Sequence, residues 1–148
     1  IPVAQRPQVR HQTGRKSVDV TRDNYLKAGV EVDVLPFIDD MAAAYAWADL
    51  VICRSGALTV SELASAGAAS VLVPYPFAVD DHQTANARYL SDAGAAILCP
   101  QKDLTPEALA STLLSVWRRE TLLEMAVKAR ELAKPEATTV VAEYCLQY

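Results

Sequence analysis

The stretch Cys53-Arg54-Ser55-Gly56-Ala57-Leu58-Thr59-Val60-Ser61-Glu62 decides the fold, because it joins the end of an apolar run to a turn of small residues and a helix start. Such a corner is the repeating unit of an α/β protein. Small residues at the turn let backbone N–H groups approach an anion, and the helix N-terminus adds partial positive charge. A second interpretation stays open, in which Thr59 caps the helix and Glu62 closes a capping box.

The composition indicates one soluble domain, since the chain has 148 residues, 51% of them hydrophobic and 22% charged. The net charge of −4 with dispersed Lys and Arg argues against a nucleic-acid surface. Cys53, Cys99 and Cys145 are far apart and lie in or beside apolar segments, which predicts reduced, buried thiols and no zinc site. No apolar stretch approaches the roughly 20 residues of a membrane span, and no signal peptide opens the chain. We therefore expect a protein that is cytoplasmic or faces the cytoplasm.

Apolar runs alternate with helical patterns, which predicts βα units around a parallel sheet. Strands are expected at residues 8–12, 30–35, 50–53, 70–73 and 95–99, with helices at 17–28, 40–48, 58–66 and 82–93. Three further helices are expected at 106–118, 120–134 and 137–147, the first of them beginning at Thr105-Pro106. Gly29, Gly67 and Gly94 stand where helices should end. Residues 1–7 are expected to be irregular, and residues 8–148 to form one Rossmann-like domain.

A doubly wound sheet binds its ligand outside the carboxyl ends of its strands. The loops that follow Leu35, Cys53 and Val73 are therefore the candidate binding segments. They contain Pro36-Phe37-Ile38, Arg54-Ser55-Gly56 and the long segment 74–81.

Three segments of the chain, at residues 37–45, 54–62 and 80–87, together resemble the MurG family. These are the peptidoglycan N-acetylglucosaminyltransferases of glycosyltransferase family 28, which have the two-domain GT-B fold. The similarity runs from about Gln8 to the carboxyl end and matches the donor-binding half. It implies part of an inverting transferase that converts lipid I to lipid II. It also implies UDP-N-acetylglucosamine as donor and a peripheral place on the cytoplasmic face of the bacterial inner membrane.

The resemblance also implies roles for individual residues. Glu62 would accept hydrogen bonds from the ribose hydroxyls, the Ala57-Leu58-Thr59 backbone would face the diphosphate, and the main chain of Ile38 would contact uracil. Gln83 would contact the sugar, and His82 is either a second sugar contact or only a helix-start residue. The substrate-binding set is Ile38, Arg54, Ser55, Gly56, Ala57, Leu58, Thr59, Val60, Ser61, Glu62, His82 and Gln83.

Two further segments leave their interpretation open. Arg54 either offsets diphosphate charge or pairs with an acid such as Asp49. The segment His11-Gln12-Thr13-Gly14 also matches the family and is expected to shape the cleft wall rather than to contact substrate.

Some parts of the family pattern are not in this chain, which begins with Ile1 rather than Met and looks like a piece of a longer protein. The family has a central strand with a Gly-rich loop before the position of Gln8, and its absence would leave the neighbouring strands unpaired or closed together. The amino-terminal domain, which binds the lipid I acceptor and supplies the proposed base, is absent too, so no catalytic residue is assigned.

No cofactor is expected. The acidic pairs Asp39-Asp40 and Asp80-Asp81 are interpreted as helix starts rather than as a metal-diphosphate motif. Two alternative functions stay open. One is a non-catalytic nucleotide-sugar-binding subunit that needs a partner chain, and the other is a different GT-B transferase that uses UDP-sugars.

Overall fold

The structure, a computed structural model, describes residues 1–147, apart from the side chain of Val79. The chain divides into two compact units, Ile1–Ala44 and the part from Tyr45 onward. Helix α2 (Met41–Trp47) spans the boundary between them. The expected α/β class with parallel strands and flanking helices is confirmed in both units.

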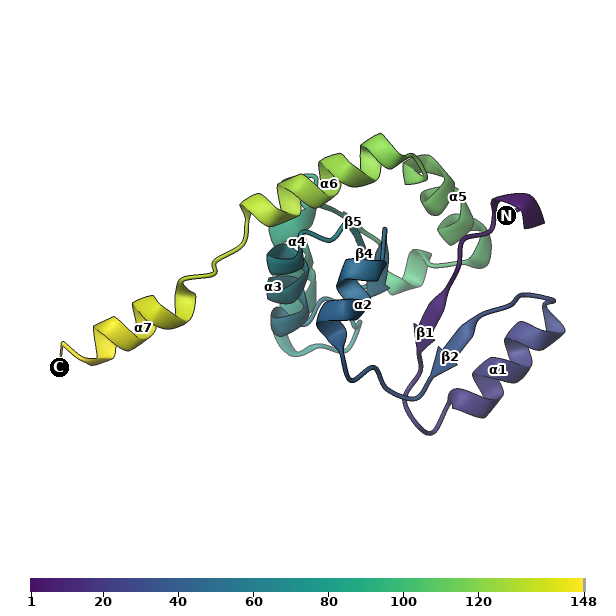
Figure 1. Ribbon diagram of the computed structural model, residues 1–148, viewed down its shortest axis with the longest axis horizontal. Helices are drawn as coiled ribbons and strands as arrows, with labels where there is room; N and C mark the ends of the chain where they lie inside the picture. The colour runs from purple at the N-terminus through teal and green to yellow at the C-terminus, as the bar shows by residue number, and fades with distance from the viewer. Residues whose placement is uncertain (148) are drawn as a thin grey trace. The chain divides into compact units, whose positions relative to one another are not determined.

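The first unit contains one βαβ motif (Figure 1). Its elements are η1 (Val3–Gln5), β1 (Arg10–Gln12), α1 (Val18–Lys27) and β2 (Asp33–Leu35). Strands β1 and β2 are parallel, with His11 opposite Val34, and helix α1 contacts β2. The stretch 1–7, expected to be irregular, therefore includes one short 3₁₀ turn.

The second unit continues the βα alternation and then ends in helices. Its elements are β3 (Val51–Cys53), α3 (Ala57–Ala66), β4 (Ser70–Leu72), η2 (Val79–Asp81), α4 (His82–Ser91), β5 (Ala96–Leu98), η3 (Gln101–Asp103), α5 (Pro106–Val116), α6 (Arg119–Glu131) and α7 (Ala137–Cys145). The three strands are parallel in the order β3-β4-β5. Each expected strand and helix is present, and the strands are shorter than the apolar runs that predicted them.

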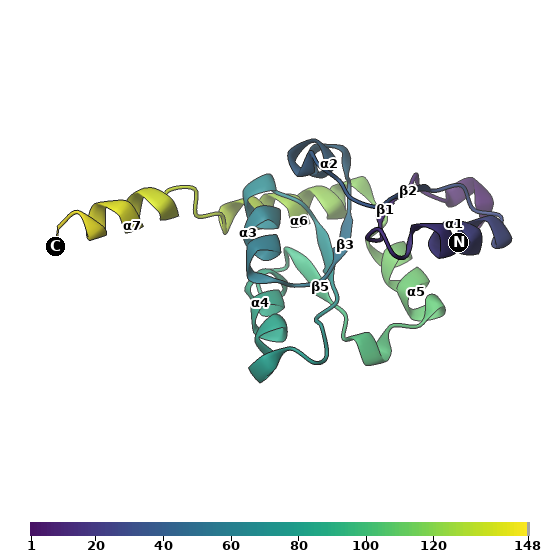
Figure 2. The same cartoon turned by 90° about the horizontal axis from the view of Figure 1, so that it is seen from below.

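The core of the second unit follows the two-residue alternation of its central strand, β4. Leu72 is fully buried and packs with Leu63 of α3 and Leu90 of α4 on one face of the sheet. Val71 points to the other face, where it forms a second cluster with Val73 and Cys99. The partly buried Leu104, just before α5, packs against this second cluster. Figure 2 shows α3 and α4 on one side of the sheet and α5 on the other. The layers are therefore those of a doubly wound sheet.

Local signals identify the end of α3 and the start of α5. Gly67 ends α3 with φ +65°, a conformation that L side chains rarely adopt, and it lies so close to α6 that an added Cβ would be 3.3 Å from the carbonyl oxygen of Ala126. Thr105 caps α5 by accepting a hydrogen bond from the Ala108 N–H over 3.1 Å. These caps depend on neighbouring residues, which is why the sequence predicts them.

The strands of the described chain form two separate sheets, β1-β2 and β3-β4-β5. Within residues 1–147, β1 pairs with β2 alone and β3 with β4 alone. Ile52, in the middle of β3, is 46% exposed. None of the helices in this range has the length and hydropathy that a membrane crossing requires.

The three cysteines are free thiols in different environments. Cys99 is buried, as expected, Cys53 is only half-buried, and the expectation that Cys145 is buried is wrong. Cys145 lies in α7, a helix without a buried residue. Burial, and then the charge of Glu62, raises the pKa of Cys53 to about 11.

We predict that Leu63→Ala lowers the free energy of unfolding by about 2 to 5 kcal/mol, since it leaves a cavity at a fully buried position. Leu58→Ala, on the same helix but with a side chain that is 80% exposed, is the matched control and should cost less than about 0.5 kcal/mol. Urea unfolding followed by circular dichroism measures both. Equal losses would contradict the packing described for α3.

We predict that iodoacetamide at about pH 8 alkylates Cys145 far faster than Cys53. A pKa of about 11 leaves about one Cys53 thiol in a thousand ionised at that pH, and the thiolate is the nucleophile. Peptide mass spectrometry over time measures the two rates. Cys145→Ser should remove the fast phase, and rapid labelling of Cys53 in that variant would contradict its described environment.

Candidate functional site

The turn after β3 is tied to the start of α4 by the fully buried Ser55. Its hydroxyl donates to the carbonyl oxygen of Gln83 over 2.8 Å, and its own carbonyl accepts from the amide nitrogen of Asn86 over 3.1 Å. Two of the three segments predicted to form the site, those after β3 and β4, are thereby joined at one edge of the sheet. Ser55 therefore builds the site and is not available to a ligand.

Helix α3 begins earlier than one interpretation of the sequence requires. Its N-cap is Gly56, with φ −62° and ψ 150°, and no side chain caps it. Thr59 is the third helical residue, so the capping box of Thr59 and Glu62 is wrong. Small, extended Gly56 allows the turn to enter the helix directly, which leaves both polar side chains of the predicted box outside the cap.

The open helix start is an anion-binding geometry. The backbone N–H of Val60 is the first in the helix to bond within it, to the carbonyl of Gly56 over 2.9 Å. The N–H groups of Ala57, Leu58 and Thr59 precede that bond and are the ones that a helix leaves unsatisfied. The side chain of Leu58 is 80% exposed, so the surface here is open. Backbone donors and helix dipole together suit a phosphate group.

Glu62 lies on the same helix, and its carboxylate is exposed. The hydroxyl of Tyr45 donates to its Oε2 over 2.9 Å. Burial, followed by the hydrogen bond and the charge of Glu62, raises the pKa of Tyr45 above its ordinary value, so the phenol keeps its proton. Val60 is buried in the core on the opposite side of the helix, and Ser61 bonds back to the Ala57 carbonyl over 3.0 Å.

Arg54 braces the loops at this edge. Its guanidinium donates to three oxygens, namely the carbonyls of Val73 (3.2 Å) and Pro74 (3.0 Å) and Oε1 of Gln101 (2.6 Å). It also lies 5.6 Å from the ring centre of Tyr75. The alternative that Arg54 pairs with Asp49 is wrong, because Asp49 precedes β3 and Arg54 follows it, at opposite ends of the strand.

The start of α4 carries the residues expected to contact a sugar. Oε1 of Gln83 accepts the Tyr75 N–H over 2.9 Å, which leaves the two N–H donors of the Gln83 amide outside this bond. His82 is the first residue of the helix and is exposed. Asp81 is the N-cap residue, as expected, but with φ 51° its carboxylate accepts from the Thr84 hydroxyl over 2.7 Å instead of from the backbone.

Ile38 belongs to the first unit, where its backbone N–H donates to Oε1 of Gln12 over 3.0 Å. The expected use of this N–H for uracil therefore competes with Gln12, whereas the carbonyl of Ile38 accepts no hydrogen bond within residues 1–147. His11, in the same predicted wall segment as Gln12, bonds through Nδ1 to the Tyr25 hydroxyl over 3.0 Å. Both residues of the predicted wall segment therefore have hydrogen-bond partners within the first unit.

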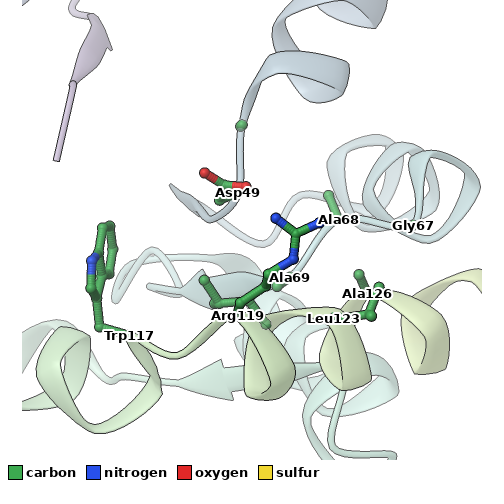
Figure 3. A pocket seen from close by; sticks show the side chains of 10 residues that line it. Asp49, Gly67, Ala68, Ala69, Trp117, Arg119, Leu123 and Ala126 are labelled. Carbon is green, nitrogen blue, oxygen red and sulfur yellow. The ribbon is translucent and has the colours of Figure 1, made fainter.

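A cavity of about 410 Å³ lies at the opposite edge of the second sheet (Figure 3). Asp49, just before β3, and Ala68 and Ala69, just before β4, line it together with Trp117 and Arg119. None of the predicted site residues lines it. The cavity therefore belongs to the amino ends of the strands, whereas the candidate site occupies their carboxyl ends.

Tyr45, Gln12 and Asn86 are site-building residues to which the sequence alone assigned no such contact. Tyr45 stands 17 positions before Glu62 and Asn86 31 positions after Ser55. No periodicity joins residues so far apart. Within residues 1–147 no group of three His, Cys, Asp or Glu side chains could hold a metal ion.

A family model described as the glycosyltransferase family 28 C-terminal domain matches residues 3–141. Among curated proteins, UDP-N-acetylglucosamine–N-acetylmuramyl-(pentapeptide) pyrophosphoryl-undecaprenol N-acetylglucosamine transferases are similar over 99% of this chain. The protein from Nitrosospira multiformis is 58% identical and that from Cupriavidus metallidurans 60% identical. The chain spans about 41% of the length of each.

Solved structures are also similar to the chain. The crystal structure of Acinetobacter baumannii MurG has a TM-score of 0.91 and 50% identity, over 95% of this chain and 43% of that one. A glycotransferase of kitacinnamycin has a TM-score of 0.62 at 19% identity, over 93% of this chain and 34% of that one, which shows a shared fold alone. With the family model matching nearly the whole chain, the protein belongs to glycosyltransferase family 28, in the region of that family's C-terminal domain.

Proposed function

We propose that this chain is the donor-binding part of an inverting N-acetylglucosaminyltransferase that converts lipid I to lipid II. The observation that carries the proposal is the open start of α3 with Glu62 on the same helix, in a chain 58% identical to a transferase named for these substrates. The donor is UDP-N-acetylglucosamine.

In this proposal the diphosphate binds at the start of α3. The N–H groups of Ala57, Leu58 and Thr59 donate to its oxygens, and Gly56 leaves room for its approach. Glu62 accepts hydrogen bonds from the 2′ and 3′ hydroxyls of the ribose, for which a carboxylate with two oxygens is suited. Arg54, which hydrogen bonds to the loop carbonyls hold in place, offsets part of the negative charge of the diphosphate.

The two ends of the donor are recognised by other groups. The carbonyl of Ile38 accepts from the uracil ring, and its N–H becomes available if the Gln12 side chain releases it. The free amide nitrogen of Gln83 donates to a hydroxyl of the N-acetylglucosamine ring. His82, exposed beside Gln83, either makes a second contact to the sugar or only starts the helix.

The reaction is an in-line displacement at the anomeric carbon. The C4 hydroxyl oxygen of the acceptor forms a bond to that carbon while the bond to the diphosphate breaks, and the electron pair leaves with UDP. The hydroxyl proton passes to a base that we assign to no residue of this chain. The α3 N-terminus stabilises the charge that develops on the departing diphosphate.

The remaining partners follow from the same proposal. Lipid I binds to an amino-terminal domain outside this chain, and the intact enzyme works at the cytoplasmic face of the inner membrane as a peripheral protein. No cofactor takes part. The chain would then contribute donor affinity and leaving-group stabilisation.

We predict that Glu62→Ala weakens the binding of UDP-N-acetylglucosamine by about 1 to 3 kcal/mol, or about five- to 150-fold in Kd. The loss follows from removing the acceptor of two ribose hydroxyls. Isothermal titration calorimetry measures it. Glu124→Ala, an exposed carboxylate on α6, is the control and should bind like the parent chain. Unchanged affinity of the Glu62 variant, with an unchanged circular dichroism spectrum, would contradict the ribose role.

We predict that the purified 148-residue chain transfers no sugar to lipid I, because this proposal assigns its base and acceptor site to another domain. Transfer of radiolabelled N-acetylglucosamine measures this. The full-length Cupriavidus metallidurans relative, assayed in parallel, is the positive control. Measurable turnover by the chain would show that the catalytic groups are misplaced.

A further inference from the structure

The hydrogen bond between Tyr45 and Glu62 joins α2 to α3 at the surface of the second unit. The ring of Tyr45 packs against the core cluster that contains Val60 and Leu63, and this packing holds the ring in place. Its hydroxyl reaches Oε2 of Glu62 at 2.9 Å. An anchored ring with a bonded hydroxyl fixes the direction of the carboxylate from one side.

Glu62 has no second partner within residues 1–147. The ion pairs of this range involve Arg10, Arg22 and Arg118, each with an acid other than Glu62. Only Oε2 is bonded, which leaves Oε1 and the remaining lone pairs of Oε2 open to a ligand. The bond therefore orients the carboxylate without occupying it.

A neutral donor is suited to this task. A lysine or arginine in place of Tyr45 would compete with ligand hydroxyls for both oxygens and neutralise the charge that makes them strong acceptors. An exposed glutamate without any partner would lose side-chain entropy when it binds a diol, and that loss weakens affinity. A hydroxyl on a ring that is held by packing restricts the glutamate side chain before the ligand binds. Most of the side-chain entropy is then already lost in the free protein.

We propose that Tyr45 is a positioning residue, whose hydroxyl holds the Glu62 carboxylate in the orientation that accepts the two ribose hydroxyls of the donor. The inference rests on the proposed function, because it gives Tyr45 no role if Glu62 does not contact ribose. Tyr45 itself touches no ligand. Its effect on affinity passes through Glu62 and depends on the ribose hydroxyls.

The test compares Tyr45→Phe with the parent chain in calorimetric titrations with UDP and with 2′,3′-dideoxy-UDP. Phenylalanine retains the ring that packs against the core and removes only the hydroxyl. We expect UDP to bind about threefold to tenfold more weakly, and dideoxy-UDP to bind with less than about a twofold change. Tyr89→Phe, which also loses one hydroxyl bond, to the Leu132 carbonyl, is the matched control and should change neither affinity.

Glu62→Gln separates this inference from the function on which it rests. We expect it to weaken the binding of UDP but not that of dideoxy-UDP. In the double variant, Tyr45→Phe should cause no further loss of UDP affinity, since both changes act on one interaction. If Glu62→Gln fails to distinguish the two nucleotides, or if the parent chain does not bind UDP, the proposed function is overturned and this inference with it. If Glu62→Gln distinguishes them and Tyr45→Phe does not, the inference alone is overturned.

An equal loss of affinity for UDP and for dideoxy-UDP in the Tyr45→Phe variant would also overturn the inference. That result would mean that the bond only fastens α2 to α3 and that its loss loosens the whole site. Thermal unfolding of the same variants would then show the matching loss of stability.

Discussion

The parallel pairing of β4 between β3 and β5 is the constraint on which the second unit depends. In-register pairs such as Ile52 with Val71 and Val71 with Ile97 hold the three strands in one direction. Because the strands are parallel, the turns after β3 and β4 emerge at the same edge. The alternation of Leu72 and Val71 then requires helices on both faces, since each side chain must be buried.

The candidate site is built from contacts between loops rather than from any one motif. Ser55 and Gln83 join the first turn to α4, and Arg54 joins it to the loop after β4 and to η3. The Arg54 bonds end on the backbone carbonyls of Val73 and Pro74 and on the side-chain oxygen of Gln101, and the Ser55 bond ends on the backbone carbonyl of Gln83. The groups that these bonds leave open are the helix-start N–H groups, which suit a phosphate, and Oε1 of Glu62, which suits a hydroxyl donor.

Both sheets have edges that no further strand covers within residues 1–147. Each sheet keeps its parallel pairs, but β1 and β3 each have one edge without a strand partner in the described chain. Such an edge presents unpaired N–H and C=O groups and is a site for association with another strand. The exposed Ile52 on β3 adds apolar surface at that edge.

The sequence by itself determined the order and type of the elements and most helix ends. Gly67, Thr105 and Asp40 act on residues within a few positions, and Asp40 accepts the Ala43 N–H over 2.8 Å at the start of α2. It also predicted that the turn after β3 lies at the carboxyl edge of a parallel sheet, which the structure confirms. It left the cap of α3 open, and the interpretation with Thr59 as the cap is wrong, since Gly56 and Thr59 each suit a helix start and local chemistry does not choose between them.

The tertiary structure alone decided the partners of the polar side chains. Gln12 with Ile38, Arg54 with Gln101 and Tyr45 with Glu62 lie 26, 47 and 17 residues apart. A hydrogen bond requires donor and acceptor to be within about 3 Å of one another, and the distance between residues so far apart depends on how the whole chain packs. The sequence therefore identified candidate nucleotide-binding residues, whereas it did not predict the hydrogen bonds that orient them.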